Sequence, residues 1–341
     1  MKSILPLAIL LFSLAAHGQL KNPKVNVLTS GTKTSLRGLS VVNDRVLWTS
    51  GSGGTVAQSS DGGKTWKWMV VKGFENRDFR DIEAFDATTA VIMAVDAPAY
   101  ILRTVDGGKN WKVVYENKTP GMFMDAMEFW NEKAGIVIGD PINGKIFVAR
   151  TFDGGSTWKE IPDTYKPVAD SGEAFFAASG TNVRVLDRDE AVFVSGGLSS
   201  RVFIRDEKTI LPVIQGRETT GANSIAVMDK NTLKGGNTLI VVGGDFSNPK
   251  SDSLNCFIST DRGRTWKAPL KGPEGYRSCV EYLSKKQVIT CGLTGVDLSQ
   301  DSGNTWTNIS NEGFHTVRKA KAGNAVYFVG GKGKIGKLSP P

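Results

Sequence analysis

Carboxylates are the first candidates for chemistry in this chain of 341 residues, because it contains only two histidines. His17 lies in an N-terminal apolar stretch, so a histidine-based zinc site is excluded and a Ser-His-Asp triad would need His315. Glycoside hydrolysis needs only two carboxyl groups at a suitable separation. The acids that could supply them are Asp81, Glu83, Asp125, Glu128 and Glu173. A carbohydrate-active hydrolase is therefore the enzymatic alternative.

A glycine-rich stretch could suggest a different chemistry. Residues 331–336 fit G-x-G-x-x-G after a strand-like run, the pattern of a dinucleotide site and hence of an oxidoreductase. That site also needs a following helix and an acid about 20 residues further on. Here Ser339-Pro340-Pro341 follow, so we expect turn glycines of a hairpin and no cofactor.

The first 18 residues are typical of a secretory signal peptide. Lys2 precedes an apolar run that ends at Ala16, and the small residues there allow cleavage before Gln19. The run is shorter than the roughly 20 residues of a membrane-spanning helix. We expect an exported monomer, periplasmic or secreted, with no stable membrane insertion.

The charge balance favours anionic partners. Lys and Arg number 42 against 34 Asp and Glu, a formal net charge of +8. No lysine-rich run or aromatic–basic interleaving of the nucleic-acid type is present, and export also argues against nucleic acid.

Three cysteines, Cys256, Cys279 and Cys291, would enter an oxidising compartment. Cys279 and Cys291 are equidistant from Lys285, which lies in an expected hairpin turn, so they should face each other across two strands. Facing residues can approach closely enough for a disulfide. Either a Cys279–Cys291 disulfide or two free buried thiols is expected.

The elements that position these residues are repeats. An octet, Ser/Thr-x-Asp-x-Gly-x-Thr/Asn-Trp, recurs at 59–66, 104–111, 151–158, 259–266 and 299–306. Seven strand-like runs that end near a glycine or an acidic turn recur in step with it, and no amphipathic helix of ten residues is found. Units of about 45 residues with four strands each predict a seven-bladed β-propeller. The expected blades are 35–69, 79–114, 123–161, 173–214, 221–270, 275–309 and 314–338, with 24–28 as the strand that closes the last blade.

Each octet has a structural explanation. The glycine supplies a positive φ, the aspartate accepts backbone amide hydrogen bonds, and the tryptophan packs between sheets. One carboxylate per octet is too few for calcium, so we expect no metal. The structural residues are Asp61, Trp66, Asp106, Trp111, Asp153, Trp158, Asp261, Trp266, Asp301 and Trp306.

The octets resemble those of Asp-box (BNR-type) propellers. The chain more closely resembles the exported seven-bladed propellers related to the photosystem II assembly and stability factor, over about 24–338, as in Phe79-Arg80-Asp81-Ile82 before TVDGGKNW. That resemblance implies a non-catalytic assembly or chaperone factor that binds a partner polypeptide. Sialidases share the octet, but their Arg-Ile-Pro segment and a tyrosine–glutamate pattern are absent from this sequence.

Arginines are the candidate binding residues. Four units align with an arginine early in the inner strand, at Arg37, Arg80, Arg277 and Arg318, whereas Met124, Glu173 and Asn223 stand there in the other units. Ring closure would gather the four into one basic arc at the channel mouth, suited to carboxylates. Two interpretations remain open: a site for a protein or anionic polymer segment of the cell envelope, or arginines that cap backbone carbonyls.

Overall fold

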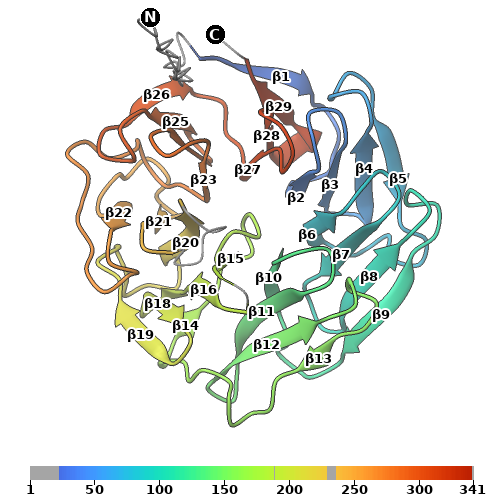
Figure 1. Ribbon diagram of the computed structural model, residues 1–341, viewed down its shortest axis with the longest axis horizontal. Coiled ribbons are helices and arrows are strands. Elements are labelled where there is room, and N and C mark those ends of the chain that lie inside the picture. Colours follow the sequence, from blue (N-terminus) through green and yellow to red (C-terminus); the bar gives the residue numbers. More distant parts are fainter. Residues whose placement is uncertain (1–22, 188, 229–235, 340–341) are drawn as a thin grey trace, which may run out of the picture.

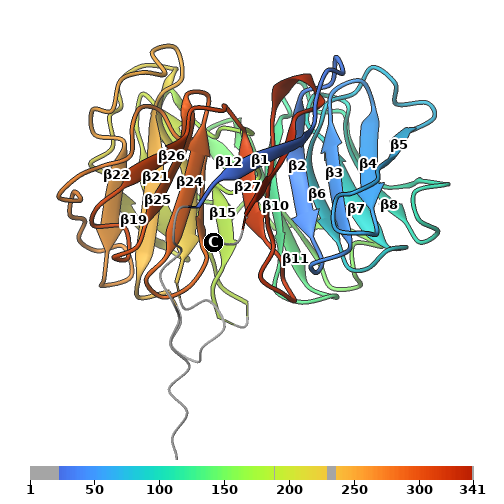
Figure 2. The ribbon, with the colours of Figure 1, turned by 90° about the horizontal axis from the view of Figure 1, so that it is seen from above.

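The computed structural model describes residues 23–187, 189–228 and 236–339. The predicted signal peptide lies outside these residues. Seven sheets are arranged around a central channel, and their strands run along its axis (Figures 1 and 2). Among the described residues the helical structure is limited to one 3-10 turn, η1 (Gly331–Gly333). The chain is an all-β, seven-bladed propeller, as predicted.

Every blade begins at the channel and proceeds outward through antiparallel neighbours. Blade 1 consists of β2 (Leu36–Val41), β3 (Leu47–Gly51), β4 (Thr55–Ser59) and β5 (Lys67–Val70). Blade 2 consists of β6 (Phe79–Ala84), β7 (Ala90–Ala94), β8 (Ala99–Thr104) and β9 (Lys112–Asn117). Blade 3 consists of β10 (Met124–Phe129), β11 (Gly135–Ile142), β12 (Lys145–Thr151) and β13 (Lys159–Glu160). Blade 4 consists of β15 (Val183–Val185), β16 (Ala191–Val194), β18 (Arg201–Ile204) and β19 (Glu207–Ile210). Blade 6 consists of β23 (Cys279–Tyr282), β24 (Val288–Gly292), β25 (Gly295–Ser299) and β26 (Thr307–Ser310).

Blade 5 departs from the four-stranded pattern. Its β20 (Thr220–Val227), β21 (Leu239–Asp245) and β22 (Cys256–Ser259) share a sheet with the short β14 (Glu173–Ala174) and β17 (Gly196–Gly197). The place of a fourth strand is taken by an isolated bridge between Ile258 and Lys267. Glu173 therefore does not begin the inner strand of blade 4, contrary to the sequence alignment, because that strand is β15.

The N-terminal strand closes the ring. Blade 7 contains β27 (Thr316–Lys319), β28 (Val326–Val329) and β29 (Ile335–Leu338), and β1 (Val25–Thr29) is its outermost strand (Figure 1). Val25 pairs with Leu338 and Val27 with Gly336. The strand predicted from the incomplete last unit is confirmed. The glycine-rich stretch forms η1 and the start of β29, so it is a hairpin connection with no following helix.

The core lies between blades rather than inside one sheet. Seven apolar clusters in the described chain each join two adjacent blades. The octet tryptophans contribute to these clusters: Trp111 meets Trp48 edge to face at 6.4 Å, and Trp158 meets Phe129 at 5.7 Å.

Candidate functional site

The five octets share one hydrogen-bond network. In the first, Asp61 Oδ1 accepts the Thr65 amide at 2.9 Å, and the Gly63 amide donates to Ser59 Oγ at 2.9 Å. The hydrogen bonds from Thr65 lower the pKa of Asp61 to about 2. Each octet aspartate is thus occupied by its own turn. Blade 4, which lacks the octet, replaces it with a two-residue turn between Ile204 and Glu207. No group of three or more His, Cys, Asp or Glu in the described chain could hold a metal ion.

The inner strands run in one direction, so the channel has a start mouth, where these strands begin, and an end mouth, where they finish. Near the start mouth, four inner strands contain a β-bulge, which follows the first residue of β2, β6 and β10 and the third residue of β20. The residues that the bulges leave out of the pairing are Arg37, Arg80, Asp125 and Asn223.

The register corrects the predicted arginine arc. The amides of Leu36, Arg277 and Phe314 each donate to a carbonyl of the preceding blade, which makes these three positions equivalent. Arg277 therefore precedes the position of Arg37 by one residue. His315 is the equivalent of Arg37 in blade 7, and Arg318 lies three residues further along the channel. Of the four predicted arginines, only Arg37 and Arg80 occupy equivalent positions in their strands.

Arg277 is not at the mouth at all. Its side chain is fully buried, and its Nε donates to Asp297 Oδ2 at 2.6 Å. Its Nη1 donates to the Tyr276 carbonyl and to Thr294 Oγ1. This arginine fits the second interpretation, a structural group that satisfies buried acceptors.

A segment of the chain occupies the channel between the two mouths. Residues 176–182, between β14 and β15, are buried from Ala177 onward, and Figure 1 shows this yellow-green chain projecting inside the ring above β15. We call residues 176–182 the channel segment. A Cβ on Gly180, whose φ is +64°, would lie 2.3 Å from an Asp81 carboxyl oxygen, so only glycine fits there.

The channel segment precedes the inner strand of blade 4 and contacts blades 1, 6 and 7. Arg37 Nη1 donates to the Ala178 carbonyl at 3.4 Å, and Arg318 Nη2 donates to the Ser179 and Gly180 carbonyls at 3.2 and 3.3 Å. The Ser179 hydroxyl donates to the Ser278 carbonyl at 2.8 Å. Sequence reasoning missed this segment because it has neither strand periodicity nor a motif.

Positive charge is concentrated at the start mouth. Arg80 forms an ion pair with Asp78 at 2.8 Å and lies over the Phe123 ring. Burial and the neighbouring charge of Arg80 lower the pKa of Arg37. Burial, reinforced by the charges of Arg37 and Arg80, lowers the pKa of His315 to about 3. We call Arg37, Arg80 and His315 the start-mouth cluster.

The acids proposed for hydrolysis have structural partners. Asp81 accepts the Met127 amide of the next blade at 2.7 Å, and burial, partly offset by the charge of Arg318, raises its pKa to about 8. Glu173 is buried and paired with Arg201. Glu128 binds Arg184 at 3.0 Å.

The buried carboxyl of Asp125 and the partly buried carboxyl of Asp140 lie close enough to interact. Burial and the charge of Asp140 raise the pKa of Asp125 well above its ordinary value. Burial also raises the pKa of Asp140 to about 6. A glycoside hydrolase mechanism would therefore have to use Asp125 and Asp140. The sequence analysis named Asp125 as a candidate acid but did not name Asp140.

The cysteines are free thiols. Cys279 and Cys291 are register partners, as their spacing predicted, but they form no disulfide in the structure. Burial opposes ionisation of Cys279, yet a hydrogen bond with Cys291 and the charge of Arg318 lower its pKa to about 6.

The fold and the octets together define an Asp-box β-propeller. The family resemblance is confirmed: residues 20–161 match the family described as photosynthesis system II assembly factor YCF48, and residues 257–268 match the BNR/Asp-box repeat. No curated protein matches the sequence.

Solved structures show the same fold. A structure of YCF48 bound to D1 peptide is 16% identical, with a TM-score of 0.65, covering 95% of this chain and 98% of that one. YCF48 from Cyanidioschyzon merolae is 17% identical, with a TM-score of 0.64 and coverage of 93% and 99%. The WD40 propeller domain of Doa1 is 13% identical, with a TM-score of 0.62 and coverage of 93% and 97%. No helix of the described residues is long and apolar enough to cross a membrane.

Proposed function

We propose that this propeller is a non-catalytic assembly factor that binds a protein or anionic segment at its start mouth. The start-mouth cluster is the observation that carries the proposal. Arg37 and Arg80 lie close enough that the charge of one lowers the pKa of the other. Like charges are seldom held together unless an acid or a ligand offsets their repulsion.

Asp78 offsets part of the positive charge of this cluster. Asp78 pairs with Arg80, and its charge partly counters the lowering of the Arg37 pKa. The side chain of Arg80 is 28% exposed, so an incoming carboxylate can reach it. An arginine fork binds a carboxylate through two parallel hydrogen bonds. The similarity to YCF48, one structure of which holds D1 peptide, supports a polypeptide partner.

Export to the cell envelope belongs to the same proposal, and its support is the signal-like sequence of residues 1–18. Cell fractionation with mass analysis of the N-terminus tests it. A mature N-terminus at Gln19 in the periplasm or medium is expected, and an uncleaved cytoplasmic protein would contradict it.

Affinity capture tests the binding site. The protein lacking residues 1–18 is immobilised and exposed to envelope extract, alongside Arg80→Gln and the control Arg264→Gln, which changes an exposed octet arginine. We expect Arg80→Gln to keep its melting temperature and to lose at least fivefold of the captured partner. Capture by wild type should also weaken as salt rises. Equal capture by a folded Arg80→Gln variant would overturn this assignment.

A further inference from the structure

The end mouth contains a second charged site, independent of the start mouth. The strand registers place one residue of each inner strand at the same level of the channel: Ser40, Glu83, Glu128, Arg184, Ala226, Glu281 and Arg318. We call these seven residues the channel ring. Five of the seven are charged, in a place where a propeller could equally carry small neutral residues.

The charged residues of the channel ring are largely removed from water. The side chains of Glu83, Glu128 and Glu281 are 18, 15 and 16% exposed, and that of Arg184 is 5% exposed. Arg184 binds Glu128 at 3.0 Å and Glu281 at 2.8 Å. Burial alone would lower the pKa of Arg184, but the negative charges of Glu128 and Glu281 raise it above its ordinary value. Arg184 therefore lies between acids of two other blades.

The positive charge lies on blade 7. Arg318 donates to carbonyls of the channel segment, and Lys319 Nζ donates to the Leu283 carbonyl at 2.7 Å. Neither residue forms an ion pair within 4.0 Å among the described side chains. Lys321 pairs with Glu83 at 2.5 Å.

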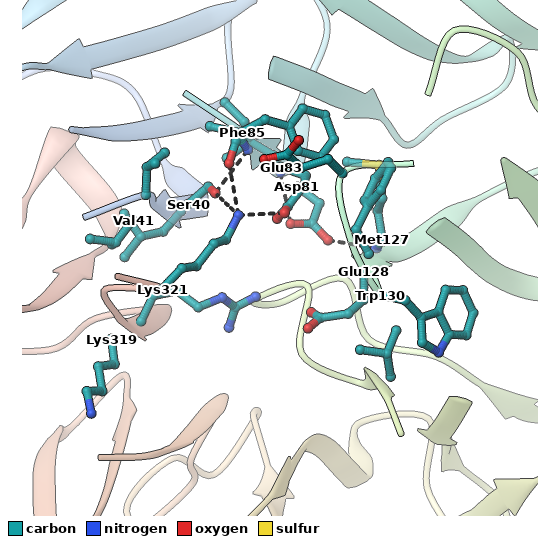
Figure 3. Close-up of a pocket in the computed structure, with 18 of the residues that line it drawn as sticks. Ser40, Val41, Asp81, Glu83, Phe85, Met127, Glu128, Trp130, Lys319 and Lys321 are labelled. Carbon is teal, nitrogen blue, oxygen red and sulfur yellow. Dashed lines mark hydrogen bonds and ion pairs between the residues drawn. The ribbon is translucent and has the colours of Figure 1, made fainter. Parts of the chain in front are cut away.

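These groups surround a cavity of about 450 Å³, within the range of small-molecule sites. Figure 3 shows Lys319 on one side of the cavity and Glu128 and Trp130 on the other. Phe85 and Met127 add apolar surface to the lining. The cavity therefore combines a cationic wall, an acidic wall and an apolar part.

We propose that this cavity binds a small zwitterion of the amino acid or short peptide class. Its carboxylate would bind Arg318 and Lys319, its ammonium group would bind the Glu128 side, and an apolar side chain would contact Trp130. Charged groups held in a partly buried cavity discriminate strongly, because an analogue that lacks one charge leaves a protein group unpaired.

Calorimetric titration tests the proposal with leucine and the dipeptide Leu-Leu as probes, and with N-acetyl-leucine amide as the uncharged analogue. We expect the wild-type protein to bind at least one zwitterion and to bind the uncharged analogue at least tenfold more weakly. Binding of neither zwitterion at 10 mM, or equal binding of the uncharged analogue, would overturn the proposal.

Two variants locate the site. Lys319→Gln changes a half-buried lysine with one backbone contact, so it should fold and lose at least fivefold in affinity. Glu128→Gln should weaken binding similarly. The matched control Lys285→Gln changes an exposed lysine of the β23–β24 turn and should leave affinity unchanged. Unchanged affinity in a folded Lys319→Gln variant would place the binding elsewhere and refute the site.

Discussion

Arg277 and Asp297 form an ion pair enclosed within blade 6, with Nε 2.6 Å from Oδ2. Both side chains are fully buried. Desolvation of two charges is costly, and their attraction compensates for it only while both partners are present. The pair therefore joins β25 to the start of the inner strand rather than offering a charge to a ligand.

Removing either Arg277 or Asp297 should lower the stability of the folded protein. We predict that Arg277→Ala lowers the free energy of unfolding by roughly 3–5 kcal/mol, the usual cost of leaving one buried charge unpaired. Urea denaturation measures this value. Partner capture per folded molecule should not change.

The control for this prediction is Arg264→Ala, which removes an exposed arginine and should alter stability by less than about 0.5 kcal/mol. Loss of capture by Arg277→Ala at unchanged stability would return Arg277 to the binding site.

The octets made the fold predictable from sequence. Each contains its own turn chemistry, so a local pattern such as Asp106 to Trp111 determines a local structure. The incomplete last unit likewise predicted that a strand near Val25 pairs with one near Leu338.

The arginine arc could not be predicted in the same way, because a bulge inserts a residue without a pairing partner. Counting from similar sequence motifs placed Arg318 with Arg37, although the β-ladders separate their positions by three residues. The glycines at or just after the end of three second strands, Gly51, Gly292 and Gly330, would have given the register of Arg37, Arg277 and Arg318. The channel segment depends on contacts with several blades, which no local pattern contains.

The octet tryptophans should matter for stability rather than for binding. Trp111 is partly buried between blades 1 and 2, where it contacts Trp48. We predict that Trp111→Ala lowers the free energy of unfolding by about 3 kcal/mol, the lower end for aromatic truncation in a core. Trp68→Ala, on the outer strand β5, serves as control and should cost clearly less. Similar losses from both variants would refute the interblade role.

His315 can report on the start-mouth cluster, since it is the one histidine that remains after removal of residues 1–18. Burial and nearby positive charges should hold its pKa near 3, far below the ordinary 6.5. We predict that Arg80→Gln and Lys334→Gln each raise this pKa, as measured by NMR titration, whereas Arg264→Gln does not. An ordinary pKa that none of the variants changes would show that the charges are not clustered.

Because the pKa of His315 is lower in the folded chain, its contribution to stability is present above pH 6.5 and is lost as pH falls toward 3. His315→Gln should reduce this part of the pH dependence. Denaturation of wild type and variant at pH 4.5 and 7 measures how much stability each loses as the pH falls. A larger loss in the variant than in wild type would contradict the prediction.

Asp81 should have the opposite pH dependence. Its pKa is raised from 3.8 to about 8, so the folded protein retains a proton that the unfolded chain releases. Stability from this group is therefore present below pH 3.8 and is lost as pH rises through 8. Asp125 and Asp140 are also raised and add to the same trend.

Asp81→Asn removes the titrating group, so its stability should decline less between pH 5 and 8 than that of wild type. The expected difference between the two declines is on the order of 4 kcal/mol, from about three pH units at 1.36 kcal/mol each. Asp163→Asn, at an exposed carboxylate paired with Lys166, is the matched control and should follow the wild-type curve. Because the comparison uses the difference between two pH values, a constant loss of stability from the substitution cancels. Parallel curves for wild type and Asp81→Asn would mean that Asp81 is ionised in the folded channel, with Arg318 as its counter-ion.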